Sequence, residues 1–277
     1  MKNETVSIDE FNRARSLFTT YSYETDRFFD ARLAFYFQIV QEAAGNHSAV
    51  RGCSIPTLHE EGKTWVITRS KIEVHRYSHW PEQLHVETWA QEPIRLHLPR
   101  VVRSFDEHHE PLFTAKTYWA LIDLERGRPC RPGRMSERIG LPPSEMQMDL
   151  SLTARTTYDD SNCTTLVTYK PKIQYLDTDS NQHVNNISYL NWALESLPAS
   201  FRDRAKVAEA DVSWIRQTFS GDDITVVSGS LDKEAFSGSE GVLYHKIVRS
   251  EEDGSMTVVW EGTTRWEKRE KLSGIPS

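Results

Sequence analysis

Cysteine is scarce in this sequence of 277 residues, with three residues that lie far apart and form no Cys-x-x-Cys pair. This scarcity argues against a disulfide framework or a redox motif and favours a reducing compartment. The chain also lacks any apolar run near the roughly 20 residues of a membrane-spanning helix, and its first residues hold no apolar stretch typical of a signal peptide. We therefore expect a cytoplasmic protein without a membrane span.

Positive charge is also in short supply, because 33 lysines and arginines face 40 aspartates and glutamates, which gives a net charge of -7. A general nucleic-acid-binding protein needs a basic surface, so we expect no nucleic-acid partner. The sequence contains neither a glycine-rich phosphate loop nor a Gly-x-Ser-x-Gly nucleophile elbow. Residues 106–111 (DEHHEP) resemble a metal site in composition, but their place between two predicted strands favours a solvated turn. We expect no metal and no cofactor.

Hydrophobic periodicity in the first half predicts one helix followed by an antiparallel meander. A short strand at 16–23 precedes a helix at about 31–51, where apolar positions recur at helical spacing. Four segments rich in β-branched and aromatic residues follow, at 64–77, 83–94, 97–105 and 111–124. Residues 126–148 contain four prolines and no apolar periodicity, which predicts an irregular connection between two domains.

The same order recurs in the second half. A strand at 163–177 is followed by a helix from 186 to about 197, and then by strands near 210–218, 224–232, 241–249 and 257–266. We therefore predict two domains, 1–145 and 146–277.

Matching residues at constant offsets indicate that the second half is a duplicate of the first. An offset of 153 relates Thr25, Asp26, Tyr36 and Glu42 to Thr178, Asp179, Tyr189 and Glu195. An offset of 140 relates Arg76, Leu84 and Val86 to Arg216, Ile224 and Val226, and one of 147 relates Trp119 to Trp266. A helix and an antiparallel sheet, taken twice, predict an α+β double hot-dog fold, with two tandem units in which a sheet wraps a long helix.

Asp179, Asn181 and His183 alternate immediately before the second predicted helix. In an extended stretch, alternate side chains point the same way, and the N–H groups at a helix start can polarise a carbonyl oxygen. The same residue types also form turns and caps, and Asn185 is a candidate cap. The first half carries Phe28 and Asp30 opposite Asn181 and His183, so the set occurs in one copy, which favours catalysis.

The strings D-x-N-Q-H-V-N-N (179–186) and Y-L-x-W-x-L-E-S (189–196) resemble the signature of the acyl-acyl carrier protein (acyl-ACP) thioesterases, and so do YSYETD, QEAAGNH and WVITR in the first half. The resemblance covers most of both halves. It implies an enzyme that hydrolyses fatty acyl-ACP to free fatty acid and holo-carrier, terminating fatty acid synthesis. It further implies that the N-terminal unit binds the acyl chain and that the C-terminal unit is catalytic.

Carried over to this chain, the family's motif positions are Asp179, Asn181 and His183. The acidic residue that the family adds on the next strand corresponds here to Gln217, whose amide can hold a water but cannot accept its proton. Either Asp179 or His183 is then the base, or turnover is weakened. Thr218 stands where plant relatives carry a cysteine, so water is the expected nucleophile.

Two rival functions stay open at this point. One is a non-hydrolytic acyl-thioester-binding protein weakened by Gln217, and the other is an acyl-thioester hydratase or dehydratase, because hot-dog units host that chemistry too. Coenzyme A instead of the carrier, and a homodimer instead of a monomer, also stay open. A candidate surface for the acidic helix of acyl carrier protein, or a merely solvated surface, consists of Arg126, Arg128, Arg131, Arg134, Arg138, Arg202, Arg204 and Lys206.

Overall fold

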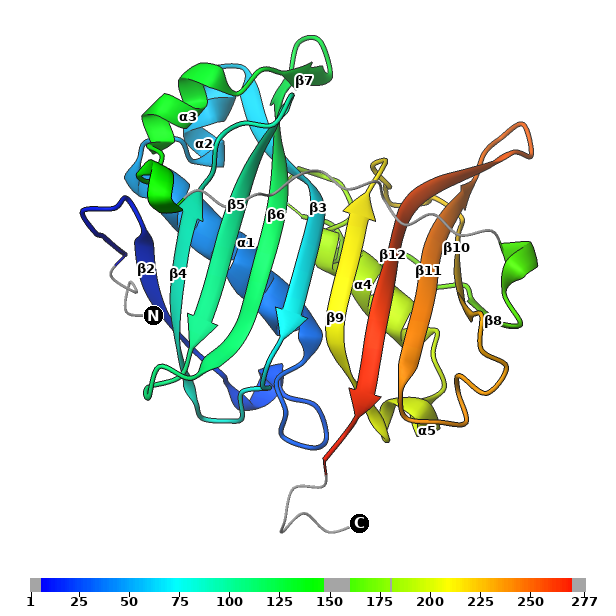
Figure 1. The fold of residues 1–277 in the computed structure, drawn as a ribbon. Helices are drawn as coiled ribbons and strands as arrows, with labels where there is room; N and C mark the ends of the chain where they lie inside the picture. The colour runs from blue at the N-terminus through cyan, green and yellow to red at the C-terminus, as the bar shows by residue number, and fades with distance from the viewer. Residues whose placement is uncertain (1–5, 147–159, 180, 271–277) are drawn as a thin grey trace. The chain divides into compact units, whose positions relative to one another are not determined.

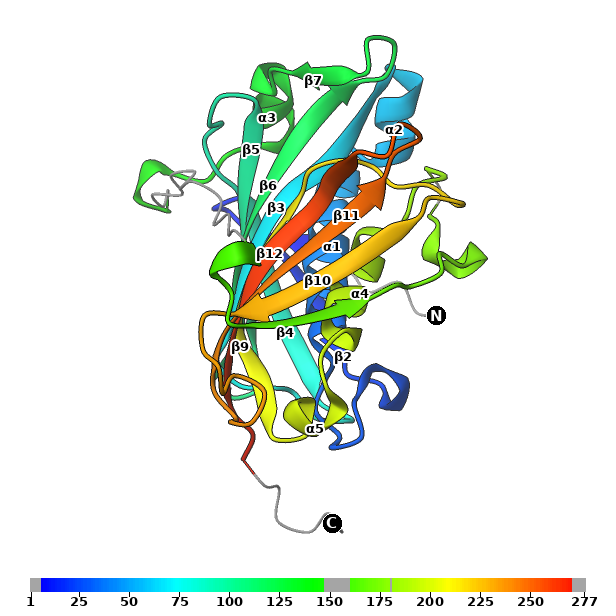
Figure 2. The ribbon, with the colours of Figure 1, turned by 90° about the vertical axis from the view of Figure 1, so that its right-hand side faces the viewer.

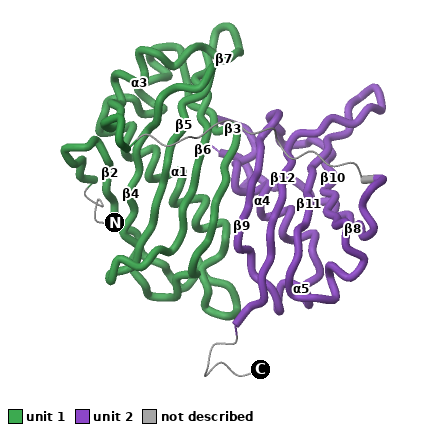
Figure 3. The backbone as a smooth tube through the Cα atoms, viewed as in Figure 1, with its two compact units in different colours: residues 1–153 green, residues 154–277 purple. Residues whose placement is uncertain are grey.

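The computed structural model describes residues 6–146, 160–179 and 181–270. The chain divides into two compact units, residues 1–153 and 154–277 (Figure 3). The predicted boundary between residues 145 and 146 borders a stretch outside the described residues, so its position stays a prediction. Within the described residues, no helix is long and apolar enough to cross a membrane.

The first unit is an antiparallel sheet with one long helix against a face (Figure 1). Its strands run in the order β1-β2-β4-β5-β6-β3, with β7 paired to β6. The helix α1 (Leu33–Val50) packs against β2, β4 and β5. The strands are β1 (Ser7–Ile8), β2 (Ala14–Thr19), β3 (Lys63–Val74), β4 (Gln83–Ala90), β5 (His97–Phe105), β6 (Pro111–Asp123) and β7 (Arg128–Cys130).

The second unit repeats this connectivity with the strand order β9-β12-β11-β10-β8. Its helix α4 (Asn186–Glu195) packs against β10 and β11 (Figure 2). In both units the strand that follows the helix pairs with the last long strand, β6 in the first unit and β12 in the second. The remaining elements are β8 (Thr165–Tyr169), α5 (Ala199–Arg202), β9 (Ala205–Trp214), β10 (Ile224–Ser230), β11 (Gly241–Ser250) and β12 (Met256–Lys268).

The helices begin and end where the sequence provides the signals. Asn185 caps α4 as predicted, because its side chain accepts the Ile187 N–H at 2.9 Å. The helix ends at Glu195, shortly before Pro198, which cannot continue it. In α1, eleven of 18 residues are buried, so the first helix contributes a broad apolar surface to the core of its unit.

Several expectations about elements are wrong. The four strands after α1 are not a simple meander, since β3 pairs with β6 rather than with β4. Residues 126–148 are not wholly irregular, because they contain β7 and the helix α3 (Gly133–Ile139). The strand predicted at 163–177 is confined to β8, and a 3-10 turn occupies Tyr175–Asp177. The short helix α2 (Ile55–Glu60) was not predicted.

Candidate functional site

The stretch that carries Asp179, Asn181 and His183 is a tight turn, so the expected extended alternation is wrong. The Asp179 N–H donates to the His183 carbonyl at 2.9 Å, and the Gln182 N–H donates to the Asp179 carbonyl at 2.9 Å. Gln182 has a φ of 63°, in the left-handed region that a turn of this kind uses. The three candidate residues therefore lie on a turn and not on an extended strand.

The Asp179 carboxylate helps to hold this turn. Its Oδ1 accepts the Asn181 N–H at 2.8 Å, which is an Asx turn. In the part of the chain that the structure describes, no other hydrogen bond of this carboxylate occurs. Asp179, Asn181 and His183 are all partly exposed, as a site that meets solvent and substrate requires.

Backbone bonds attach the turn to the start of α4. The Asn185 N–H donates to the Asp177 carbonyl at 2.6 Å, and the Val184 N–H donates to the Thr218 carbonyl at 2.9 Å. With the Ile187 N–H capped by Asn185, most N–H groups at this helix start already have acceptors. The helix start therefore leaves few free N–H groups for a bound carbonyl.

The Val184 bond brings the loop that follows β9 against the turn. Gln217 lies on this loop, where its side chain is exposed and its carbonyl accepts an N–H of Arg249 at 2.9 Å. Thr218 is fully buried and lies against Tyr189, whose pKa burial raises to about 12. The Thr218 hydroxyl is therefore closed off from solvent in this structure.

Phe219 is a further member of the site that the sequence reasoning missed. Its ring meets the His183 imidazole edge-on, with centroids 5.1 Å apart and planes at 82°. It is 43% exposed, so it borders solvent beside the imidazole. The repeat offset of 140 could have drawn attention to this position, because it places Phe219 opposite His79.

The first unit contains the same turn with different chemistry. The Asp26 N–H donates to the Asp30 carbonyl at 2.8 Å, and Asp26 Oδ1 accepts the Phe28 N–H at 2.8 Å. Phe29 has a φ of 64°, as Gln182 has 63°. The backbone of the turn is thus duplicated, whereas Asn181 and His183 are replaced by Phe28 and Asp30.

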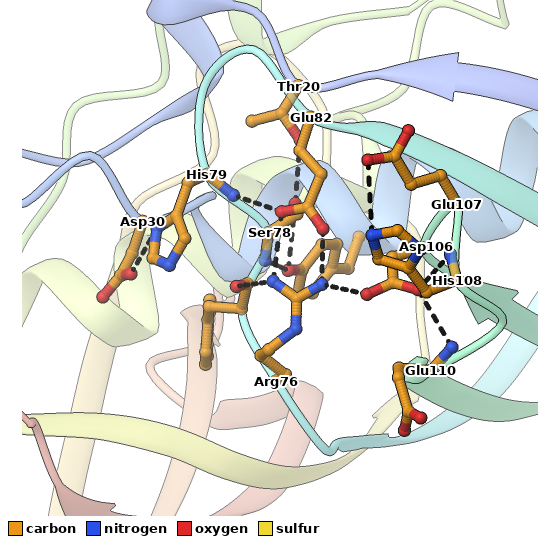
Figure 4. Close-up of polar contacts among 12 residues, drawn as sticks. Thr20, Asp30, Arg76, Ser78, His79, Glu82, Asp106, Glu107, His108 and Glu110 are labelled. Atoms are coloured by element: carbon orange, nitrogen blue, oxygen red, sulfur yellow. Dashed lines mark hydrogen bonds and ion pairs between the residues drawn. The ribbon is translucent and has the colours of Figure 1, made fainter.

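Ion pairs occupy the corresponding place in the first unit (Figure 4). Asp30 lies 3.1 Å from His79 Nδ1, and the Asp30 carboxylate raises the pKa of His79. Glu82 accepts the His79 backbone N–H at 3.0 Å and pairs with Arg76, which also pairs with Asp106 at 2.8 Å. The charged groups described here pair with one another.

Comparison with known proteins identifies the family. Residues 12–134 match the family model of the acyl-ACP thioesterase N-terminal domain, and residues 160–268 match that of the acyl-ACP thioesterase C-terminal domain. The chain belongs to the acyl-ACP thioesterase family. Membership confirms the predicted family and class of enzyme, a thioester hydrolase that acts on acyl-ACP.

Curated relatives of this acyl-ACP thioesterase come from plants. An oleoyl-acyl carrier protein thioesterase of Arabidopsis thaliana, described as chloroplastic, is 25% identical over 91% of this chain and 75% of its own length. A chloroplastic palmitoyl-acyl carrier protein thioesterase of Gossypium hirsutum is 28% identical over 92% of this chain and 64% of its own length. The chain spans about half of a palmitoyl-acyl carrier protein thioesterase of Arabidopsis thaliana, 52%.

Solved structures share the fold. An acyl-ACP thioesterase from Bacteroides thetaiotaomicron superposes with a TM-score of 0.71 and 22% identity, over 92% of this chain and 98% of that one. A 12:0-ACP thioesterase from Umbellularia californica superposes with a TM-score of 0.78 and 20% identity, over 93% and 98%. The predicted α+β double hot-dog fold is confirmed. The catalytic assignment of Asp179, Asn181, His183 and Gln217 stays a prediction.

Proposed function

We propose that this acyl-ACP thioesterase uses the turn at 179–183 to hydrolyse fatty acyl-ACP to free fatty acid and holo-carrier, which ends fatty acid synthesis. The observation that carries the proposal is the comparison of the two turns. Their backbones match, yet Asn181 and His183 occur in the second unit alone, where they are partly exposed. A purely structural role would not need this difference.

In the proposed reaction a water molecule attacks the thioester carbon. His183 or the free Oδ2 of Asp179 accepts the water proton, and the Asn181 amide positions the water or the carbonyl. Gln217 holds the water through its amide. When the tetrahedral intermediate collapses, the carbon–sulfur bond breaks, the carrier sulfur takes a proton and leaves as a thiol, and the fatty acid remains.

We further propose that the first unit binds the acyl chain and that the second performs catalysis, as the predicted domains 1–145 and 146–277 imply. The occurrence of Asn181 and His183 in the second unit alone supports this division, and each methylene of an acyl chain that the first unit buries would contribute about 0.8 kcal/mol. The depth of such a binding site would then select chain length. A cytoplasmic location and a homodimer are also proposals, the location resting on the low cysteine content.

The test is the rate at which a His183→Ala variant hydrolyses a purified acyl-ACP. The assay measures the free thiol and the free fatty acid that are released. We expect turnover to fall at least 100-fold, as the loss of an acid–base group generally causes. His79→Ala is the control, because His79 is a partly exposed histidine of the first unit that pairs with Asp30, the residue opposite His183, and it should retain turnover. Wild-type turnover by His183→Ala would remove His183 from the mechanism.

Product analysis separates the rival functions. Tight binding of acyl-ACP without released thiol would identify a non-hydrolytic binding protein. A change in unsaturation of the acyl chain, with the thioester intact, would identify a hydratase or dehydratase.

A further inference from the structure

The eight basic residues predicted as a candidate carrier surface fall into two groups. Some already contact carboxylates or carbonyls of this chain, and the others do not pair with a carboxylate among the described residues. In the second unit, Arg202 pairs with Glu195 at 2.8 Å, and Lys206 lies 3.7 Å from Glu267. Arg204 donates to three carbonyls of the loop at 236–238. These three side chains already have partners within their own unit, so they are poor candidates for binding another protein.

In the first unit, Arg138 is also occupied, since it pairs with Glu61 at 2.6 Å and donates to the Gly52 carbonyl. Four exposed arginines remain, and in the described part of the chain none of them pairs with a carboxylate. They are Arg126, Arg128, Arg131 and Arg134.

Two of these arginines border a groove of about 620 Å³. Its apolar floor consists of Leu121, Cys130 and Met135, and its other lining residues are Glu61, Lys63, Arg131, Gly133, Arg134 and Arg138. Four basic residues against one acidic residue give the groove a formal charge of +3, on a chain whose net charge is -7. A local positive field of this kind attracts an acidic partner against the background of the whole molecule.

The helix α3 explains why the arginines face outward. Met135 and Ile139 are four residues apart and are buried in one core cluster, together with Leu121 and Cys53. Packing of this face into the core directs the neighbouring Arg134 toward solvent. The groove is therefore held by the core of the first unit and does not depend on a loop.

We propose that this groove is the docking surface for the acidic helix of acyl carrier protein. The inference rests on the proposed function, in which the carrier is the handle of the substrate. Carboxylates along the carrier helix would pair with the guanidinium groups of Arg131 and Arg134, which suit bidentate contacts, and with the Lys63 ammonium. The apolar floor receives a hydrophobic side chain of the same helix, which fixes the register of the complex.

The experiment compares two substrates that differ in the carrier alone, an acyl-ACP and the acyl-pantetheine of the same chain length. In an Arg131→Glu/Arg134→Glu variant we expect kcat/KM for acyl-ACP to fall at least tenfold at low salt. The value for acyl-pantetheine should stay within twofold of the wild type. Salt should lower the wild-type rate on acyl-ACP much more than that of the variant, because screening weakens an electrostatic contact.

Arg126→Glu/Arg128→Glu is the matched control, since it makes the same charge change on exposed arginines outside the groove. We expect less than a threefold effect on either substrate. Equal losses of kcat/KM for acyl-ACP in both double variants would show that only the net charge matters and would overturn the proposal. An unchanged kcat/KM in Arg131→Glu/Arg134→Glu would also overturn it. Hydrolysis of acyl-pantetheine in every variant would show that the proposed function stands even if the docking surface is wrong.

Discussion

At the scale of single residues, Asp179 has one observed task and one proposed task. One carboxylate oxygen closes the turn, as Asp26 does in the first unit, and the other is the one that we propose for catalysis. Because Asp26 makes the same bond in the copy that lacks Asn181 and His183, the turn-forming task cannot be what distinguishes the two units. A substitution that keeps one task and removes the other can therefore assign the residue.

We predict that Asp179→Asn preserves the fold and reduces turnover. The amide oxygen still accepts the Asn181 N–H, so the melting temperature should change by only a degree or two, whereas an amide cannot act as a base. We expect kcat to fall at least 100-fold, within the range of general acid–base catalysis. Thermal unfolding and acyl-ACP hydrolysis check this, with Asp26→Asn as the control for the turn.

Turnover at the wild-type rate in Asp179→Asn would restrict Asp179 to its structural bond. His183 would then be the remaining candidate for the base.

At the scale of elements, the sequence predicted the helices and strands that have a clear hydrophobic periodicity or a clear capping residue. The strand β5 and the start of α4 were predicted to the residue, because the first is rich in strand-forming residues and the second has an Asn cap. The helices α2 and α3 have six and seven residues, too few to show periodicity. Ser54 followed by Pro56 is the sequence signal that could have indicated α2. In the structure Ser54 caps this helix by accepting the Thr57 N–H, and Pro56 lies in the first turn.

For the candidate site, the sequence supplied the candidate residues, which stay a prediction, and gave their local geometry wrongly. Alternation suggested a strand for 179–183, but the Asp side chain competes for a backbone N–H and forms a turn instead. The contact of Phe219 with His183 depends on a bond between two distant segments, from Val184 N–H to the Thr218 carbonyl. No local sequence pattern predicts a contact between two segments that are so far apart in the chain.

We predict that the loop after β9 acts on catalysis through Phe219. In Phe219→Ala the imidazole loses its ring contact, and we expect kcat to fall about tenfold with KM unchanged, about 1.4 kcal/mol of barrier. Phe219→Tyr keeps the ring and should retain most of the rate. Steady-state kinetics of the two variants test this prediction. A wild-type kcat in Phe219→Ala would show that the contact between Phe219 and His183 has no effect on catalysis.

At the scale of the whole molecule, each unit buries one neutral histidine in its core. In the second unit a directed series of hydrogen bonds, each of 2.7 Å, leaves every member satisfied. It runs from Trp266 N–H through Thr264, His245, Ser228 and Ser196 to the Ala193 carbonyl. In the first unit, Arg100 can only donate, so His47 Nδ1 must accept its bond at 2.9 Å and cannot carry a proton.

These two histidines predict that the protein loses stability in mild acid. Burial lowers the pKa of His47 and of His245 to about 3, whereas an unfolded histidine titrates near 6.5. Below about pH 6.5 the unfolded state binds protons that the folded state does not, so the free energy of unfolding falls, by roughly 4 kcal/mol at pH 5 for both together. His79 acts in the opposite direction, because its pKa is raised, and offsets part of this loss.

Thermal unfolding at pH 7.5 and pH 5 measures the effect. His245→Asn keeps a donor toward Ser228 but does not titrate, so it should reduce the pH dependence by about half. A pH dependence that is the same in His245→Asn and in the wild type would show that other groups control acid stability.

The duplicated turn has a consequence for how this chain can diverge over evolutionary time. Selection on shape acts on both copies, since each turn must close and join its helix, whereas selection on the proposed chemistry would act on one. Among natural relatives we therefore expect the aspartates at 26 and 179 to be retained alike. Residues 28 and 30 should drift together with their ionic neighbours, while 181 and 183 stay fixed.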